Sequence, residues 1–318
     1  MKKTALVTGC SEGGAGYAIA LELQSQGIRV FAIARTLRTM TKLQDAGIEI
    51  FAMDVTVPST IQSVKVEIEK LTGGTLDILI NNAGVIYQAA AIEADIEAVK
   101  SLFAVNVYGV MEVTKVFSPL LIEASRYHIS HNTGFSPRII NIGSLASFIP
   151  ATFYSAYNAS KAAVTMYGNT LRIEMEPFGV KVVTVHMGRV LTKIIRDDDW
   201  KGLPEGSLYS PIKATYEGPS HEVSPGKPDI PFTCAAKYLL TTITENGISC
   251  EAFAKVLVPQ ILQKNPPAFV WAAGQPWRTW FIDRFFSRTV WDSILKKGLQ
   301  LDKVGAAFRK DIADRKSV

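Results

Sequence analysis

Short, mostly apolar runs alternate with longer stretches of mixed polarity along most of the chain. Apolar runs of this length, bounded by turn-forming residues, are typical of strands buried on both faces of a parallel sheet. The mixed stretches have the spacing of helices that bury one face. The pattern predicts strands at 4–8, 28–34, 48–53, 76–80, 138–143, 180–186 and 268–271. The clearest helices are predicted at 58–71, 105–125, 154–176 and 232–245.

Strands that alternate with helices from the N-terminus onward favour an α/β fold with a doubly wound parallel sheet of about seven strands. A chain of 318 residues is long enough for one large domain with a complete core, and 47% hydrophobic and 20% charged residues are ordinary for a globular enzyme. We expect one domain over 1–272, followed by a C-terminal helical extension over 273–318.

Cysteines and histidines are few and scattered. Three cysteines without paired spacing predict free thiols in a reducing compartment, and four histidines without a cluster predict no metal site. His128 and His131 lie in a polar insertion, 126–137, which we expect to be a surface loop.

The turn after the first predicted strand is rich in glycine. Gly9, Gly13, Gly14 and Gly16 follow the strand, and a helix begins directly after them. This arrangement brings a pyrophosphate against backbone N–H groups, because side chains in the turn would hold the phosphates away. A tight turn that binds no ligand is the alternative.

Two arginines follow the second predicted strand. Arg35 and Arg38 stand there, and no acid occupies 28–44. A site that prefers NAD usually places an acid at the ribose 2′-hydroxyl, whereas an arginine suits the 2′-phosphate of NADP. The charges favour NADP(H) as cofactor, and a solvated basic loop is the alternative.

Polar residues also follow later apolar runs. Asp54 ends the run at 48–53, the segment 81–84 (Asn-Asn-Ala-Gly) follows the run at 76–80, and Asn106 lies farther along the chain. Each residue alone is more often a turn former or a cap. Together they indicate a ligand site at the carboxyl edge of a parallel sheet.

Tyr157 and Lys161 stand four residues apart in Tyr-Asn-Ala-Ser-Lys, and Ser144 lies thirteen residues upstream at the end of an apolar run. A lysine one helical turn from a phenol lies on the same face, and its charge favours the phenolate. A nearby hydroxyl can hydrogen-bond a carbonyl oxygen. The three groups describe a site that protonates an oxygen while a hydride reaches the adjacent carbon.

These motifs, in this order, resemble those of the short-chain dehydrogenase/reductase family over about residues 3–272. The resemblance implies a Rossmann-type fold and an NADP-dependent oxidoreductase that acts on CH–OH and C=O groups. It implies that Tyr157 is the catalytic acid and that Lys161 lowers the Tyr157 pKa and holds the nicotinamide ribose. Ser144 would orient the substrate carbonyl, and Asn106 would help to hold a water that links the lysine to solvent.

The family pattern also implies a set of cofactor contacts, in which 81–84 borders the adenosine ribose and Asp54 meets the adenine. The expected cofactor-binding residues are Gly9, Ser11, Gly14, Gly16, Arg35, Asp54, Asn82, Ala83, Gly84, Tyr157, Lys161, Gly188, Val190 and Thr192.

Two segments depart from the usual family pattern. The cofactor loop has one extra residue if Gly14 and Gly16 are its second and third glycines. After the strand at 180–186, Met187 replaces the usual proline, although Gly188 and Thr192 keep the family spacing. Arg189 adds a cation there, which can meet an anionic substrate or the cofactor phosphates, or can lie on the surface.

The substrate side is less defined. The segment 188–230 is long and rich in Gly, Pro, Ser and Asp, which is typical of a lid or substrate loop. Phe148, Phe153 and Tyr154 flank the expected serine and tyrosine, and can line the pocket or serve as core or rim aromatics.

The C-terminal extension combines aromatic residues with a surplus of basic ones. An amphipathic helix of this kind can contact a membrane interface peripherally through 275–318, pack on the enzyme, or form a dimer contact. No run reaches about 18 apolar residues, which argues against a spanning helix. The aromatic residues are Trp277, Trp280, Phe281, Phe285, Phe286 and Trp291.

Partners and location follow from these features. The net charge of +5 mildly favours anionic partners, but no nucleic-acid motif is present. Family members are often dimers or tetramers that pair through helices such as 105–125 and 154–176, so the resemblance implies a homo-oligomer. A strand within four residues of the N-terminus leaves no secretory signal, so we expect a cytoplasmic protein, or one on the cytosolic face of the endoplasmic reticulum or a lipid droplet.

We expect an NADPH-dependent reductase of a hydrophobic ketone that also oxidises the alcohol. The cofactor loop, the 188–192 segment and the extension are similar to one branch of the family, which includes NADPH-dependent 1-acyldihydroxyacetone-phosphate reductases and reductases of fungal secondary metabolism. The substrate would then be an acyl-glycerone phosphate or a secondary-metabolite intermediate. Epimerisation or isomerisation by transient oxidation, and a catalytically silent cofactor-binding protein on a lipid surface, are the alternatives.

Overall fold

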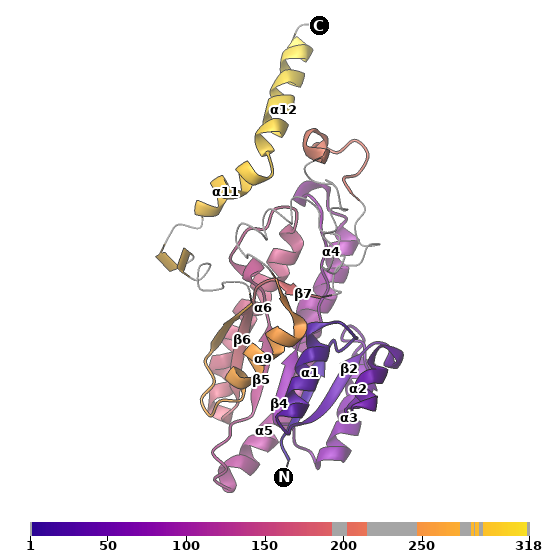
Figure 1. The fold of residues 1–318 in the computed structure, drawn as a ribbon, viewed down its shortest axis with the longest axis vertical. Coiled ribbons are helices and arrows are strands. Elements are labelled where there is room, and N and C mark those ends of the chain that lie inside the picture. The colour runs from indigo at the N-terminus through magenta and orange to yellow at the C-terminus, as the bar shows by residue number, and fades with distance from the viewer. Residues whose placement is uncertain are drawn as a thin grey trace.

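The computed structural model describes residues 2–192, 202–214, 247–273, 281–282, 284–285 and 289–316. Within them a seven-stranded parallel sheet carries helices on both faces (Figure 1). The predicted helix at 232–245 and most of the expected lid at 188–230 lie outside the described residues.

The sheet confirms the predicted doubly wound fold, and each strand lies within two residues of its predicted ends. In spatial order the strands are β3 (Glu49–Ala52), β2 (Arg29–Ala34), β1 (Thr4–Thr8), β4 (Ile78–Asn81), β5 (Arg138–Ile142), β6 (Lys181–Met187) and β9 (Phe269–Ala272). A separate parallel pair joins β7 (Val190–Leu191) to β8 (Ile248–Ser249). The pattern missed this pair because two residues are too few to show a period.

The strand order reverses between β1 and β4. The chain winds outward from β1 through β2 to β3, and then crosses back to β4 on the other side. In open α/β sheets this reversal leaves a crevice at the carboxyl ends of the central strands, where ligands bind. The fold therefore places the site residues that follow β1, β4 and β5 at one edge.

Helices bury the apolar side chains of both sheet faces. One face packs against α1 (Ala15–Ser25) and α9 (Cys250–Ile261). The other face packs against α3 (Pro58–Thr72), α5 (Val110–Ser130) and α6 (Ser155–Met175). Strands covered in this way need few polar residues, which explains the mostly apolar runs in the sequence.

A long helical segment runs over residues 96–130. It consists of α4 (Ile96–Phe103), a π-helical turn at Ala104–Gly109, and α5, so the helix predicted at 105–125 was too short at both ends. This segment is long and apolar enough to cross a membrane by length and composition, although half of its most apolar window is buried within the protein. The burial arises because α5 packs Val113, Phe117 and Leu121 on the sheet.

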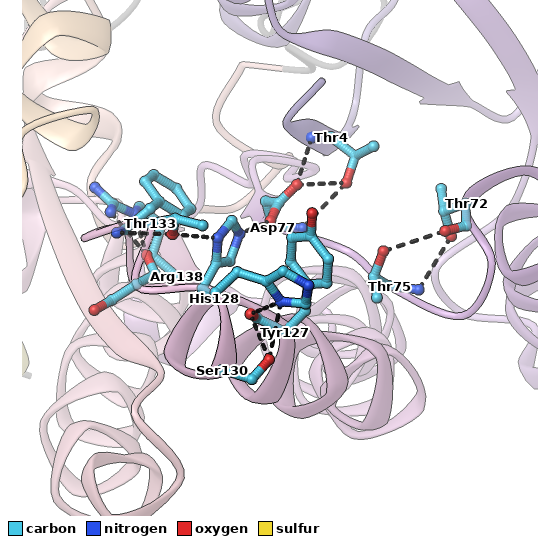
Figure 2. Close-up of polar contacts among 12 residues, drawn as sticks. Thr4, Thr72, Thr75, Asp77, Tyr127, His128, Ser130, Thr133 and Arg138 are labelled. Atoms are coloured by element: carbon cyan, nitrogen blue, oxygen red, sulfur yellow. Dashed lines mark hydrogen bonds and ion pairs between the residues drawn. The ribbon is translucent and has the colours of Figure 1, made fainter. Parts of the chain in front are cut away.

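The polar insertion at 126–137 is not wholly a surface loop, as had been predicted. Residues up to Ser130 belong to α5, and His128 is buried at 8% exposure. Its Nε2 atom lies 2.6 Å from Asp77 Oδ1, and its Nδ1 atom lies 2.7 Å from Thr133 Oγ1 (Figure 2). A buried carboxylate partner, far away in the sequence, holds this histidine inside.

The C-terminal extension begins by packing on the body of the protein. α11 (Val290–Gly298) buries Trp291 and Leu295 against Leu145 and Ile149. α12 (Leu301–Lys316) then extends away from the body (Figure 1). Of the alternatives for the extension, intramolecular packing is confirmed for α11.

Candidate active site

The glycine turn after β1 leaves no room for side chains. Gly9 has a φ of +75°, and a Cβ atom there would lie 2.8 Å from Ala83 Cα. A Cβ atom on Gly16 would lie 2.5 Å from the Gly9 carbonyl oxygen. Gly14 is the N-cap residue of α1, and Ser11 accepts a backbone hydrogen bond from it at 3.0 Å. The start of α1 thus approaches the turn closely, which is the arrangement that a bound pyrophosphate requires.

Two side chains hold this turn against β4. Asn82 donates from Nδ2 to the carbonyl oxygens of Thr8 at 2.8 Å and Gly9 at 3.1 Å. The Thr8 hydroxyl accepts from the backbone N–H groups of Asn82 and Ala83, both at 3.0 Å. Asn82 and Ala83, which were predicted to contact the cofactor, therefore hold the glycine turn in place. Thr8 was not among the predicted site residues, although a hydroxyl directly before Gly9 could have indicated a hydrogen bond that shapes the turn.

Ser144, Tyr157 and Lys161 meet at the carboxyl end of β5. Ser144 caps a short 3₁₀ helix, η4 (Leu145–Ser147), by accepting from the Ala146 N–H at 3.1 Å. Its side chain lies near enough to the Tyr157 hydroxyl to influence the Tyr157 pKa. Lys161 donates from Nζ to the Ile142 carbonyl oxygen at 3.0 Å, and its Nζ lies 5.8 Å from the centroid of the Tyr157 ring.

Burial dominates the ionisation of both helical residues. It raises the pKa of Tyr157, and the nearby Ser144 side chain opposes that shift only in part. Burial also lowers the pKa of Lys161 to about 8. The net shift of the Tyr157 pKa is therefore upward, because removal of the phenol from water outweighs the other influences on it. The lowering contribution of Lys161 that the resemblance implies stays a prediction.

Asn106 lies in the π-helical turn and joins the loop after β4 to α6. Its Oδ1 atom accepts from the Val85 N–H at 2.8 Å, and its Nδ2 atom donates to the Val85 carbonyl at 2.9 Å and to Ser160 Oγ at 3.1 Å. A Cβ atom on Gly84 would lie 3.3 Å from Asn106 Oδ1 and 3.6 Å from Lys161 Nζ. Asn106 is thus adjacent to the lysine, and Ser160 is a supporting residue that sequence reasoning missed inside the Tyr-x-x-x-Lys motif.

Thr8, Val55, Ala83 and Val105 lie close together near the carboxyl end of β1. Asp54 stands next to Val55 at the end of β3, but its Oδ1 atom accepts from Thr56 N at 2.9 Å and Thr56 Oγ1 at 2.7 Å. That oxygen therefore caps the turn that follows Asp54, which is the turn or cap role given above as the alternative to a ligand contact.

Comparison with known proteins agrees with this geometry. Residues 3–201 match the sequence model of the short chain dehydrogenase family. The chain belongs to the short-chain dehydrogenase family. It is therefore an NAD(P)-dependent oxidoreductase.

Three similar proteins illustrate the relationship. Short-chain dehydrogenase fogD of Aspergillus ruber is 37% identical over 305 residues, covering 96% of both chains. The NADPH-dependent 1-acyldihydroxyacetone phosphate reductase of Schizosaccharomyces pombe is 42% identical over 216 residues, covering 67% of this chain and 69% of that one. A crystal structure of a short-chain dehydrogenase from Streptomyces avermitilis has a TM-score of 0.68 at 24% identity, covering 96% and 98% of the two chains.

The residues that were predicted to contact the nicotinamide follow β6. Gly188 donates its N–H to the Ala272 carbonyl at 2.8 Å, and β7 contains Val190. Arg189 is half-buried, burial lowers its pKa, and its stem packs so closely on Gly247 that a Cβ atom there would lie 2.9 Å from Arg189 Cγ. Thr192 ends the described segment, so these contacts place the backbone of 188–192 and leave both alternatives for Arg189 open.

The three aromatic residues predicted for the substrate pocket have different surroundings. Phe148 stacks on Trp271 at 5.4 Å and meets His186 edge-on at 4.8 Å, so it packs over β6 and β9 as the core alternative predicted. Tyr154 donates its hydroxyl to Gln88 Oε1 at 2.7 Å. Phe153 is buried and meets the Tyr209 ring edge-on at 5.3 Å.

The described part of the expected lid is attached to the loop after β4. Ser207 donates from Oγ to the Glu93 carboxylate at 2.9 Å, and the Leu208 N–H donates to the same carboxylate at 2.9 Å. Ser207 is 6% exposed. This attachment brings residues 202–214 next to Phe153, and nothing in the sequence indicated it, because the partners lie 114 residues apart.

Proposed function

We propose that this short-chain dehydrogenase reduces a ketone with NADPH and oxidises the corresponding alcohol in reverse. The meeting of Ser144, Tyr157 and Lys161 at the end of β5, beside the glycine turn, supports the proposal most directly. A silent cofactor-binding protein would have no need to keep this set together in the crevice.

The side chains have distinct roles in this proposal. Ser144 donates a hydrogen bond to the carbonyl oxygen, and Tyr157 gives that oxygen a proton as negative charge builds on it. Burial raises the Tyr157 pKa, so the phenol is protonated and able to donate at neutral pH. The reduced nicotinamide, when bound, supplies the hydride. Lys161, with a pKa lowered to about 8, can return a proton to the phenolate.

NADP is the proposed form of the cofactor. Arg35 is exposed directly after β2, where the adenosine ribose lies in sheets of this topology. An exposed guanidinium can pair with a 2′-phosphate in two parallel hydrogen bonds. The relative from Schizosaccharomyces pombe is named as NADPH-dependent, which supports the same choice.

The proposed substrate is a hydrophobic ketone, either an acyl-glycerone phosphate or an intermediate of secondary metabolism. Support comes from the apolar cluster of Phe153, Leu203, Ile212 and Leu299 beside the catalytic helix. The name of the relative from Schizosaccharomyces pombe favours the first class of substrate.

The deciding experiment measures NADPH oxidation with a panel of 1-acyldihydroxyacetone phosphate, long-chain ketones and cyclic ketones. We expect turnover by the wild type and a loss of about 10²–10⁴-fold in Tyr157→Phe. Tyr167→Phe, on the same helix but packed toward the sheet, is the matched control. Equal activity of Tyr157→Phe would overturn the mechanism. Turnover with only catalytic amounts of cofactor would instead indicate epimerisation or isomerisation.

We also propose self-association and peripheral membrane contact. Tyr108, Met111, Met166 and Ile173 expose apolar surface on the π-helical turn, α5 and α6, which supports a homo-oligomer through these helices. Light scattering of Met166→Glu tests it, since a smaller particle is expected.

Phe308 and Ile312 are exposed on α12 at 65% and 38%, which supports contact with a cytosolic membrane or lipid-droplet surface. Liposome flotation of the double alanine variant tests that contact.

A further inference from the structure

The catalytic serine begins a short turn that has little support of its own. The Ser144 carbonyl accepts from the Ser147 N–H at 3.1 Å, and the Leu145 carbonyl accepts from Phe148 at 2.9 Å and Ile149 at 3.0 Å. These bonds lie within the turn, so they fix its shape but not its position on the protein. Two outside contacts help to place it, since Thr165 Oγ1 of α6 donates to Ser147 Oγ at 3.0 Å and Phe148 stacks on Trp271. The rest of its position comes from the side chains that the turn buries.

Those side chains pack against the C-terminal extension. Leu145 and Ile149 are each 5% exposed and form one cluster with Trp291 and Leu295 of α11, which are 1% and 4% exposed. Trp291 and Leu295 stand four residues apart, so they lie on the same face of α11. α11 therefore covers the outer side of the turn that presents Ser144 to Tyr157.

A second contact of the extension supports the neighbouring catalytic segment. Leu299, just after α11, clusters with Phe153, which directly precedes the helix of Tyr157. Phe153 has a φ of +69°, a backbone conformation that costs energy for a residue with a side chain. Such a conformation persists only where its surroundings hold it, and Leu299 is part of those surroundings.

We propose that Trp291 and Leu295 are positioning residues for Ser144. By filling the space behind the turn at 144–149, they keep the serine hydroxyl within hydrogen-bond reach of Tyr157. The expected effect on kcat rests on the proposed reductase function, whereas the expected effect on the position of the turn does not. A displacement of about 1 Å in a catalytic group can cost up to about 100-fold in rate.

The kinetic test uses Trp291→Ala and a ketone that the wild type reduces. We expect kcat to fall about tenfold, while the dissociation constant for NADPH stays within about twofold because the glycine turn lies elsewhere. Trp291→Phe keeps most of the packing volume and removes an indole N–H that has no hydrogen-bond partner among the described residues, so it should restore most of the rate. Lys297→Ala, exposed on the same helix, is the control.

A double-mutant cycle separates positioning from general loss of stability. In a Ser144→Ala background, Trp291→Ala should lower kcat much less than it does in the wild type, because the group that it positions is gone. Equal losses in both backgrounds would overturn the proposal.

Hydrogen exchange provides a test that does not depend on activity. In Trp291→Ala the backbone amides of 147–149 should exchange at least about tenfold faster, while those of α1 and β1 stay unchanged. Leu295→Ala, with a smaller cavity, gives the same measurement if Trp291→Ala does not fold. Unchanged exchange at 147–149 would overturn the proposal, whether or not a ketone is reduced. A wild type that turns over no ketone would overturn the proposed function alone.

Discussion

Lys161 Nζ donates a hydrogen bond to the carbonyl oxygen of Ile142, at 3.0 Å, from a side chain that is only 6% exposed. Ile142 ends β5, two residues before Ser144, and Lys161 stands one turn after Tyr157 on α6. One ammonium group thus joins the strand that presents the serine to the helix that presents the tyrosine. Because burial lowers the pKa of Lys161 to about 8, the charge of this ammonium group changes with pH just above neutrality.

The rate of ketone reduction should depend on the protonation of Lys161. Burial lowers the pKa of Lys161 to about 8, so the side chain is charged below that pH and neutral above it. Tyr157 stays protonated over this range, because burial raises its pKa. We expect kcat/KM for the ketone to be constant through neutrality and to fall as the pH rises through about 8. A pH profile with no break below 10, the ordinary pKa of tyrosine, would contradict this role.

Lys161→Met should stabilise the protein while it abolishes turnover. The lysine pKa is 10.5 in the unfolded chain and about 8 in the folded one, so the unfolded state binds more protons between these values and wild-type stability rises with pH there. Below about 8 the cost of burying the charge is at its full value. We expect the free energy of unfolding to rise by about 1–2 kcal/mol at neutral pH. This figure already subtracts the stability lost with the hydrogen bond to Ile142.

Urea unfolding at several pH values checks this prediction. The advantage of Lys161→Met over the wild type should shrink as the pH rises from about 8 toward 10.5. An advantage that grows over that range would show that burial does not lower the lysine pKa.

The sheet was predictable from sequence because its strands are buried on both faces. Runs such as 4–8 and 138–142 are buried throughout and mostly apolar, and that signal does not depend on distant partners. The approach of Ser144 to Tyr157 was also predictable, since Ser144 follows β5 and Tyr157 lies in the first turn of the next long helix, α6. These features are local in sequence or follow from topology.

Features that depend on contacts between distant residues were not predictable. His128 is buried by Asp77, 51 residues earlier, and Ser207 meets Glu93, 114 residues earlier. Phe148 was as plausible in a pocket as in a core until Trp271 was placed beside it. The net direction of the Tyr157 pKa shift was unpredictable for a related reason, because the depth of burial decides it and residue spacing does not give that depth.

Gly16→Ala should impair cofactor binding. A Cβ atom there would lie 2.5 Å from the Gly9 carbonyl oxygen, which is backbone and cannot rotate away. The glycine turn must therefore open, and we expect NADPH binding, measured by fluorescence titration, to weaken at least about tenfold. Gly305→Ala, where the nearest atom to the new Cβ is the end of the Arg309 side chain at 3.4 Å, is the matched control. Unchanged NADPH affinity in Gly16→Ala would remove the glycine turn from the site.

Arg35→Asp should shift the cofactor preference from NADPH toward NADH. The new carboxylate repels a 2′-phosphate and can accept a hydrogen bond from a 2′-hydroxyl. We expect the ratio of the NADPH and NADH dissociation constants to change by at least about tenfold. Arg126→Asp makes the same charge change at the C-terminal end of α5, away from β2, and should leave the ratio unaltered. A ratio that is equal in both variants would exclude Arg35 from the cofactor site.

The buried pair of Asp77 and His128 should contribute to stability and not to catalysis. Asp77 Oδ2 accepts from the Thr4 N–H at 2.7 Å and from Thr4 Oγ1 at 3.1 Å, while Oδ1 meets His128 (Figure 2). The pair joins the starts of β1 and β4 to the end of α5, at the sheet edge opposite the active site. Its distance from Ser144 separates its effect on folding from any effect on chemistry.

His128→Ala removes one partner of a buried carboxylate, so we expect the free energy of unfolding to fall by about 2–4 kcal/mol. His131→Ala is the matched control, because His131 is exposed on the next turn and contacts mainly Tyr127, so it should cost less than about 1 kcal/mol. Below its unfolding temperature, His128→Ala should keep wild-type kcat/KM. A large loss of activity in a fully folded His128→Ala sample would show that this edge of the sheet is coupled to the active site. Equal losses of stability in His128→Ala and His131→Ala would show that the contact of His128 with Asp77 does not stabilise the fold.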